Sequence, residues 1–134
     1  MGFFGLFGGS GGNILVVEDE PDIAEGVKAF LDKQGFTVSI AGDGALGVQM
    51  ALKERFALII LDINLPVLDG FSVCQSLRRD PKTADVPVLV LTALNMISDV
   101  EKALGAGAND YIPKPYTNDR LLAKVNKLLG REGK

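Results

Sequence analysis

LIILDINLPVLDG (residues 58–70) carries four large apolar residues that lead directly into a carboxylate, Asp62. A short apolar run rich in Ile and Leu is typical of a strand that is buried on both faces of a parallel sheet. Pro66 cannot extend a central strand and Asp69-Gly70 is a turn signal, so Asp62 is expected where the strand gives way to a loop. In open α/β sheets, ligands bind outside the carboxyl ends of the strands. The sequence therefore predicts that Asp62 is the reactive group.

Apolar segments alternate along the chain with segments of helical spacing. The expected strands cover residues 13–18, 36–41, 56–61, 87–92 and 110–113, and the expected helices begin near residues 21, 44, 70, 98 and 117. Such alternation predicts right-handed crossovers and a doubly wound α/β fold, in which helices cover both faces of a parallel sheet. Pro113, in the last expected strand, indicates an edge of that sheet.

Apolar residues that recur at helical spacing predict the buried face of each helix. They are Ile23, Val27, Phe30 and Leu31 on the first helix, Leu46, Val48 and Met50 on the second, Val73 and Leu77 on the third, and Leu121, Leu122, Val125, Leu128 and Leu129 on the last. Gly35 is expected to end the first helix, and Thr117 to cap the last. Residues 98–101 (SDVE) have the pattern of a capping box, so Ser98 is expected to cap the fourth helix.

Composition excludes several classes of function. The chain has 134 residues, enough for one domain, and a net charge of −3 with no basic tract. Direct contact with nucleic acid is therefore not expected, and Arg78-Arg79 is interpreted as a solvated helix end. Without His, the chain has no His-based acid–base chemistry and no His metal ligand. Its single cysteine, Cys74, is expected to be a buried filler in a helix.

The first twelve residues differ in composition from the rest. In MGFFGLFGGSGG (residues 1–12) glycine makes up half the segment, and the bulky residues are Phe3, Phe4, Leu6 and Phe7. This segment is interpreted as a flexible tail, native or added for expression, or as a tethered docking peptide for an apolar groove. Residues 13–130 are expected to form the domain, with 131–134 as a short C-terminal tail. No apolar run approaches the ~20 residues that span a bilayer and no secretory signal is visible, so a cytoplasmic location is expected.

Polar side chains follow four of the expected strands. Glu18 and Asp19 follow the first, Asp62 follows the third, Thr92 ends the fourth and Lys114 follows the fifth. Three converging carboxylates repel one another unless a cation lies between them, and an all-oxygen ligand set favours Mg²⁺, with Mn²⁺ as the alternative. Lys114 adds a fixed positive charge and Thr92 a hydroxyl donor. Each residue alone has a structural explanation, such as helix-dipole stabilisation by the acids, but the joint pattern suits in-line phosphoryl transfer.

With these residues in these positions, the chain resembles the receiver domain of bacterial two-component response regulators. The matching motifs are ILVVEDE (14–20), LIILDINLPVLDG (58–70), PVLVLTA (87–93) and GANDYIPKP (107–115), and the resemblance covers residues 13–130. It implies a CheY-like, flavodoxin-type (βα)5 fold with strand order 2-1-3-4-5. It also implies that Asp62 is the phosphoacceptor. Mg²⁺ would be held by the carboxylates of Asp19 and Asp62 and the backbone carbonyl of Asn64, with Glu18 acting through a water.

The resemblance further implies a switch. Lys114 would pair with Asp62 and then with the phosphoryl group, and the Lys114–Pro115 bond would be cis. Thr92 would bond a phosphoryl oxygen, and its shift would let Tyr111 swing inward. The phosphoryl group would come from a phospho-His of a sensor histidine kinase or phosphotransfer protein. A target protein would bind the surface formed by the fourth helix, fifth strand and fifth helix.

Two other functions remain open from the sequence. A pseudo-receiver would keep the fold as a protein-interaction or localisation module without phosphorylation; the intact set of polar residues argues against it. A Mg²⁺-dependent aspartyl-phosphate phosphatase of the haloacid dehalogenase type uses the same chemistry. That family has its nucleophile on the first strand with a second Asp two residues on, whereas here Asp62 is on the third strand and is followed by Asn64. The chain is therefore expected to catalyse only its own phosphotransfer and autodephosphorylation.

Overall fold

Five parallel strands form a single sheet in the computed structural model, which describes residues 12–93 and 97–131. The elements are β1 (Asn13–Val17), α2 (Pro21–Lys33), β2 (Thr37–Ala41), α3 (Gly44–Lys53), β3 (Leu58–Asp62), α4 (Gly70–Arg79), β4 (Val88–Thr92), α5 (Ile97–Gly105), β5 (Asp110–Pro113) and α6 (Asn118–Leu128). The strand order is β2-β1-β3-β4-β5, which confirms the predicted doubly wound order. The tail residues Phe3, Phe4, Leu6 and Phe7 lie outside the described residues.

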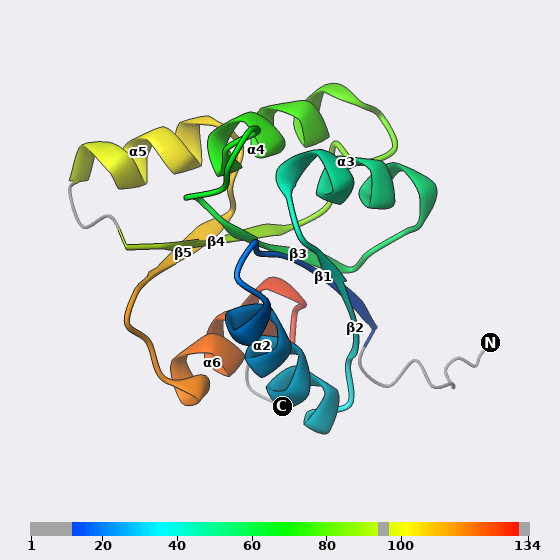
Figure 1. The fold of residues 1–134 in the computed structure, drawn as a ribbon, viewed down its shortest axis with the longest axis vertical. Helices are drawn as coiled ribbons and strands as arrows, with labels where there is room; N and C mark the ends of the chain where they lie inside the picture. The colour runs from blue at the N-terminus through cyan, green and yellow to red at the C-terminus, as the bar shows by residue number, and fades with distance from the viewer. Residues whose placement is uncertain (1–11, 94–96, 132–134) are drawn as a thin grey trace.

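Helices cover both faces of the sheet, with α3, α4 and α5 on one face and α2 and α6 on the other (Figure 1). Because side chains alternate along each strand, β1 sends Leu15 and Val17 into the core beneath α3 and α4, and Ile14 and Val16 into the core beneath α2 and α6. Every residue of β3 and β4 is buried, as expected for strands covered on both faces. Asp62 and Thr92 are the last residues of these strands, so the packing of the strands determines where both side chains lie.

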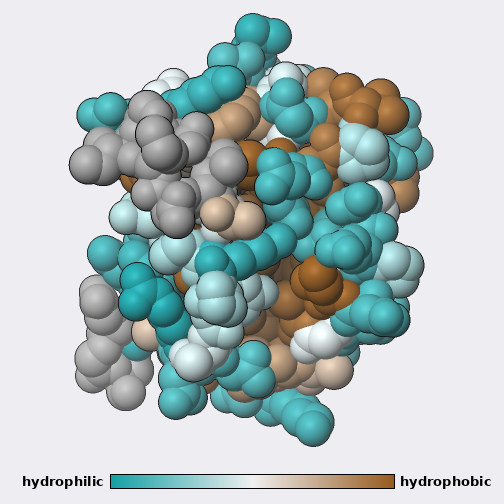
Figure 2. Space-filling view, turned by 60° about the vertical axis from the view of Figure 1, so that its left-hand side comes forward, coloured by the Kyte–Doolittle hydropathy of each residue, from teal (hydrophilic) through white to brown (hydrophobic). Residues whose placement is uncertain are grey.

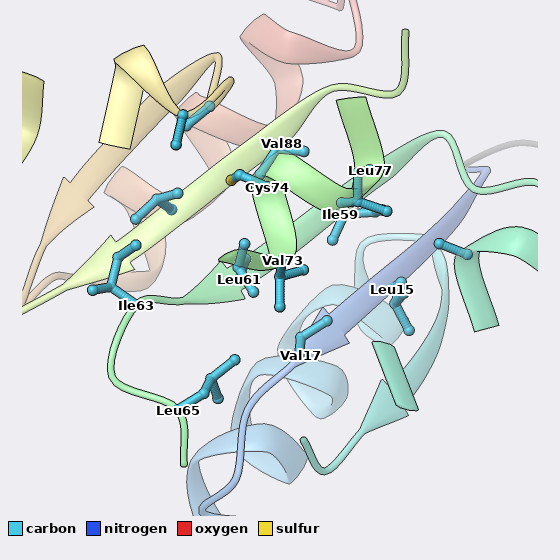
Figure 3. Packing of buried hydrophobic residues seen from close by; sticks show 14 of the residues in the cluster. Leu15, Val17, Ile59, Leu61, Ile63, Leu65, Val73, Cys74, Leu77 and Val88 are labelled. Carbon is cyan, nitrogen blue, oxygen red and sulfur yellow. The ribbon is translucent and has the colours of Figure 1, made fainter. Parts of the chain in front are cut away.

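The central helix of the first layer is α4, which packs along β3 and β4. Figure 3 shows its residues Val73, Cys74 and Leu77 directed at the sheet, beside strand residues Ile59 and Val88. Cys74 is buried, and that burial raises the pKa of its thiol to about 11, which confirms its interpretation as a filler.

The prediction that Ile23 and Leu46 face the core is wrong. Ile23 is 36% and Leu46 is 40% exposed, while Val27, Leu31 and the predicted faces of α4 and α6 do pack inward. On α3 the contact with the sheet is made by small residues: a Cβ added to Gly47 would lie 2.9 Å from Cγ2 of Val17. Such a close approach turns the glycine side of the helix to the sheet and leaves Leu46 facing outward.

Thr117 caps its helix as predicted, and Asp69 caps α4, where the sequence predicted only a turn. Asp69 accepts a hydrogen bond from the Ser72 amide (2.9 Å), and Thr117 accepts one from the Arg120 amide (3.1 Å). Helix α5 begins at Ile97, so Ser98 lies inside its first turn and is not the N-cap, contrary to the capping-box prediction.

Arg78 is not the solvated residue that the sequence suggested. Its guanidinium donates to four backbone carbonyls and to the Asn109 side chain, whereas Arg79 is exposed as expected. It joins the end of α4 to the loops that precede β4 and β5.

Large apolar side chains are exposed at few described positions, namely Ile23, Leu46, Val67 and Leu104. The face in Figure 2 is mostly hydrophilic, with hydrophobic residues gathered in separate areas. None of the described helices is both long enough and apolar enough to cross a bilayer.

Candidate functional site

Three acids meet where β1 and β3 end. Glu18 and Asp19 directly follow β1, and Asp62 is the last residue of β3, its neighbour in the sheet. A carboxylate oxygen from each lies within 4.8 Å of the others. Glu18 and Asp62 are buried and Asp19 is exposed, so the cluster has one side open to solvent. Parallel strands bring their carboxyl ends to one edge, which is how residues 43 positions apart along the chain come together.

Lys114 supplies the positive charge of the site. It follows β5 and its Nζ donates to Oδ2 of Asp62 at 2.7 Å, while Oε1 of Glu18 lies 3.9 Å away. Burial lowers the pKa of Lys114, but the hydrogen bond and charge of Asp62, together with Glu18, outweigh burial and leave this pKa raised. Lys114 is therefore held as a cation against Asp62. The Lys114–Pro115 bond is cis, as the resemblance implied.

Backbone amides hold the two buried carboxylates in place. The Asn64 amide donates to Oδ1 of Asp62 at 2.9 Å, and the Glu20 amide donates to Oε2 of Glu18 at 3.1 Å. Behind Asp62 the first turn of α4 presses on the strand end: a Cβ on Gly70 would lie 2.7 Å from the Asp62 carbonyl oxygen. Glycine at position 70 is thus required by packing, although the sequence suggested only a turn.

Glu18 is the least satisfied group of the site. Its Oε1 is buried and, among the described residues, has no hydrogen-bond donor. Burial raises the pKa of Glu18 to about 7; the adjacent Asp62 adds to the rise, while the Glu20 amide and Lys114 oppose it. The site offers only oxygen ligands, from clustered carboxylates, and one of these oxygens has no hydrogen-bond donor among the described residues. Such a site fits a hard divalent cation such as Mg²⁺.

Thr92 and Tyr111 lie on β4 and β5, the two strands that follow β3 in the sheet order. Thr92 is buried at the end of β4, and its carbonyl accepts a hydrogen bond from the Lys114 amide at 2.7 Å. Tyr111 lies in β5, is half-buried against the core beneath α4 and α5, and has Lys124 Nζ 6.0 Å from its ring centroid. Thr92 therefore lies at the same end of the sheet as the three acids. Tyr111 lies on the neighbouring strand, β5, which is part of the surface predicted to switch.

The family of this chain follows from the match between its sequence and known proteins. The model of the response regulator receiver domain matches residues 14–126. The chain belongs to this family.

Relatives with curated descriptions include a transcriptional regulator and response regulators. This receiver domain is 46% identical over 118 residues to the DNA-binding dual master transcriptional regulator RpaA of Synechocystis sp., and 41% identical to the response regulator MprA of Mycobacterium ulcerans. Each match covers 88% of this chain but only 49% and 50% of the respective relative. The chain thus spans about half the length of the curated relatives it matches.

Solved structures agree with the fold. The receiver domain of a sensor histidine kinase from Pseudomonas aeruginosa PAO1 has a TM-score of 0.84 at 36% identity, covering 90% of this chain and 99% of that one. It was solved with a magnesium ion coordinated in its active site cleft. The chemotaxis protein CheY4 of Vibrio cholerae has a TM-score of 0.83 at 30% identity, covering 87% of this chain and 98% of that one.

The sequence did not single out Tyr116 beside the acids, nor Val67 in the loop after β3. Burial raises the pKa of Tyr116, whose hydroxyl also feels the charges of Lys114, Glu18 and Asp62. Its position two residues after Lys114 is the only sequence signal for it. Val67, in the loop between β3 and α4, is fully exposed and has a φ of +68°, which no residue-type pattern announces.

Val67→Gly is expected to stabilise the domain by ~1 kcal/mol. A β-branched residue at positive φ is strained by ~1–3 kcal/mol, and glycine relieves that strain while losing ~0.5–1 kcal/mol through its freer unfolded chain. Urea denaturation would measure the gain, with Val67→Ile as the control that keeps the β-branch and is expected to change nothing. A loss of stability in Val67→Gly would contradict the strain.

Glu18→Gln is expected to stabilise the metal-free domain at pH 8 but not at pH 4. Glu18 is protonated in the folded state up to about pH 7 but only up to 4.5 when unfolded, so its ionisation removes stability as the pH rises from 4.5 through 7. That difference corresponds to at most ~3 kcal/mol, which the neutral amide does not lose. Thermal unfolding in a chelator at both pH values would measure this, and the exposed Glu20→Gln is the control. Equal effects of Glu18→Gln at both pH values would refute it.

Proposed function

We propose that this receiver domain accepts a phosphoryl group on Asp62 from a phospho-His of a sensor histidine kinase or phosphotransfer protein. The observation that carries this proposal is the 2.7 Å contact between Lys114 Nζ and Asp62 Oδ2 beside two further carboxylates. A reactive carboxylate with a fixed cation on one oxygen is suited to receive a dianionic group.

The transfer joins one oxygen of Asp62 to phosphorus and breaks the phosphorus–nitrogen bond of the phospho-His, whose nitrogen leaves with the electron pair. Lys114 stabilises the charge on the equatorial oxygens, and the Thr92 hydroxyl donates to one of them. The Asn64 amide, which holds Oδ1, keeps the carboxylate oriented during the attack.

The proposed metal is Mg²⁺, with Mn²⁺ able to replace it. Asp19 and Asp62 would hold it through their carboxylates, Asn64 through its carbonyl, and Glu18 through a water. When bound, such an ion neutralises the acids and the incoming phosphoryl oxygens. The buried Oε1 of Glu18, which lacks a donor among the described residues, supports this assignment.

The proposed output is a change of the surface of α5, β5 and α6, which are the fourth helix, fifth strand and fifth helix of the sequence prediction. Thr92 would move toward the phosphoryl group and the half-buried ring of Tyr111 would fill the space it leaves. A protein target would read this surface. RpaA is described as DNA-binding, but this chain matches only half of it, and the net charge of −3 supports a receiver that makes no direct DNA contact.

Amide spectra of the ¹⁵N-labelled domain would test the proposal. Beryllofluoride or acetyl phosphate with Mg²⁺ is expected to shift amides around Asp62, Thr92 and Tyr111, and neither reagent is expected to do so in a chelator. No shift with either reagent would leave the pseudo-receiver as the better function. Turnover of a generic phosphomonoester that is lost in Asp62→Asn would favour the phosphatase instead.

A further inference from the structure

A cavity of about 180 Å³ lies at the edge of the sheet opposite Asp62. It opens between the end of α3 and the loop that joins α4 to β4, where strands β3 and β4 begin. Its apolar wall is formed by Ala51, Phe56, Ile59, Val86 and Pro87. A second hollow of about 140 Å³ shares Ala51 with it and continues along Leu52. We call the two hollows together the α3–β4 groove.

The groove has a charged rim around an apolar floor, and the charges of the rim balance. Its rim carries two acids, Glu54 and Asp85, and two bases, Arg55 and Lys82, so neither sign of ligand charge is preferred. An apolar cavity of ~150 Å³ is large enough to take a benzene molecule, so the larger hollow can hold one phenyl ring.

The described chain begins beside this groove. A Cβ on Gly12 would lie 3.4 Å from Cβ of Ala57, and the Ala57 amide donates to the Asn13 carbonyl at 2.8 Å. Ala57 directly follows Phe56, which lines the cavity. The start of β1 and the loop between α3 and β3 lie on the same side of the molecule in Figure 1. Gly12, the first described residue, therefore lies next to the groove wall.

The sequence before Gly12 offers a matching ligand. Phe3, Phe4, Leu6 and Phe7 are apolar and uncharged, and the five-residue spacer GGSGG (8–12) joins them to β1. A Gly-rich spacer of that length has a root-mean-square span of ~12 Å, and the groove at β3 and β4 is one to two strand spacings from β1, or ~5–10 Å. A spacer that matches its span gives an effective concentration in the millimolar range, so weak apolar contacts suffice.

We propose that residues 3–7 of the same chain dock in the α3–β4 groove, with a phenyl ring in the larger hollow. The docked segment covers apolar wall residues far from Asp62. Its presence is therefore separate from phosphorylation and can be tested without it.

Methyl and amide spectra of the full chain would test this proposal. Replacing Phe3, Phe4, Leu6 and Phe7 together by Ser is expected to shift the Ile59 and Val86 methyl signals and the Thr83 amide, equally at high and at tenfold lower protein concentration. Ser10→Ala, which keeps the apolar residues, is the control and is expected to shift none of them.

A second variant blocks the groove. In an Ala51→Leu background, whose larger side chain fills the hollow, the same Ser replacements are expected to leave these signals unchanged. Two results would overturn the proposal: changes confined to Gly12, Asn13 and Ala57, which would show an undocked tail, or changes that vanish on dilution, which would show docking on a second copy.

Discussion

Asp62→Asn is expected to abolish phosphoryl uptake by the domain. Asparagine has the shape of aspartate, so the backbone contact from Asn64 to Oδ1 and the packing of Gly70 behind the strand end have no reason to change. It lacks the anionic oxygen that would form the acyl phosphate. Intact-mass measurement after acetyl phosphate and Mg²⁺ is expected to show one added phosphoryl group in the parent protein and none in the variant.

The same substitution is expected to lower the pKa of Glu18. Asp62 raises that pKa through its carboxyl contact and its charge, so removing the charge leaves burial as the main remaining cause. A pH titration followed by Glu18 side-chain signals would measure the fall. This readout is independent of phosphorylation and reports whether the two acids are coupled as the geometry indicates.

Asp69→Asn is the matched control for Asp62→Asn. Asp69 lies in the same loop, is exposed, and caps α4 through the Ser72 amide, a role that asparagine fills equally well. The control is expected to be phosphorylated like the parent. If Asp62→Asn still took up a phosphoryl group while Asp69→Asn did not, the assignment of the phosphoacceptor would be wrong.

The polar residues around Asp62 could be predicted from the sequence because one rule places them. Glu18, Asp19, Thr92 and Lys114 each stand at or after the end of a strand, and a parallel sheet brings those ends to one edge whatever the details of packing. This rule predicts which side chains lie near Asp62, but not the distances between them. The 2.7 Å contact of Lys114, and the buried Oε1 of Glu18, depend on the exact path of the loops after β5 and β1.

Features that depend on contacts between distant segments could not be predicted in this way. Leu46 fits the apolar pattern of its helix, yet Gly47 lets α3 approach Val17 so closely that the glycine side faces the sheet. The φ of Val67 is set by the turn between β3 and α4, and a valine carries no signal for it. Arg78 looks like any charge at the end of a helix, because its partners come from loops up to 31 residues away.

Arg78→Ala is expected to destabilise this domain by ~2–4 kcal/mol. Its Nε donates to the Gly107 carbonyl at 3.0 Å, and Nη1 donates to the carbonyls of Val86 (2.7 Å), Ala84 (3.1 Å) and Thr83 (3.3 Å). Hydrogen bonds from a charged donor are worth ~1.5–3 kcal/mol each, but Arg78 is only half-buried, so water replaces part of what is lost.

The loss of Arg78 is also expected to weaken the start of β4, because Asn109 connects the two. Its Oδ1 accepts from Nη2 of Arg78 at 2.9 Å and from the Val88 amide, the first of β4, at 2.8 Å. Without the guanidinium, Asn109 keeps one of two donors and the start of β4 becomes less well held. Faster hydrogen exchange of the Val88 amide in Arg78→Ala is therefore expected alongside a lower urea midpoint.

Two variants separate geometry from charge. Arg79→Ala removes the exposed neighbouring charge and is expected to change stability by less than ~0.5 kcal/mol. Arg78→Lys keeps the charge, but a single ammonium has too few donors to bond both the loop before β4 and the loop before β5, so most of the loss is expected to remain. Equal stability of Arg78→Lys and the parent would show that charge alone suffices.

Thr83 and Val86, whose carbonyls accept from Arg78, also line the α3–β4 groove. Arg78→Ala is therefore expected to weaken any docking in the groove, because the loop that forms its wall becomes less stable.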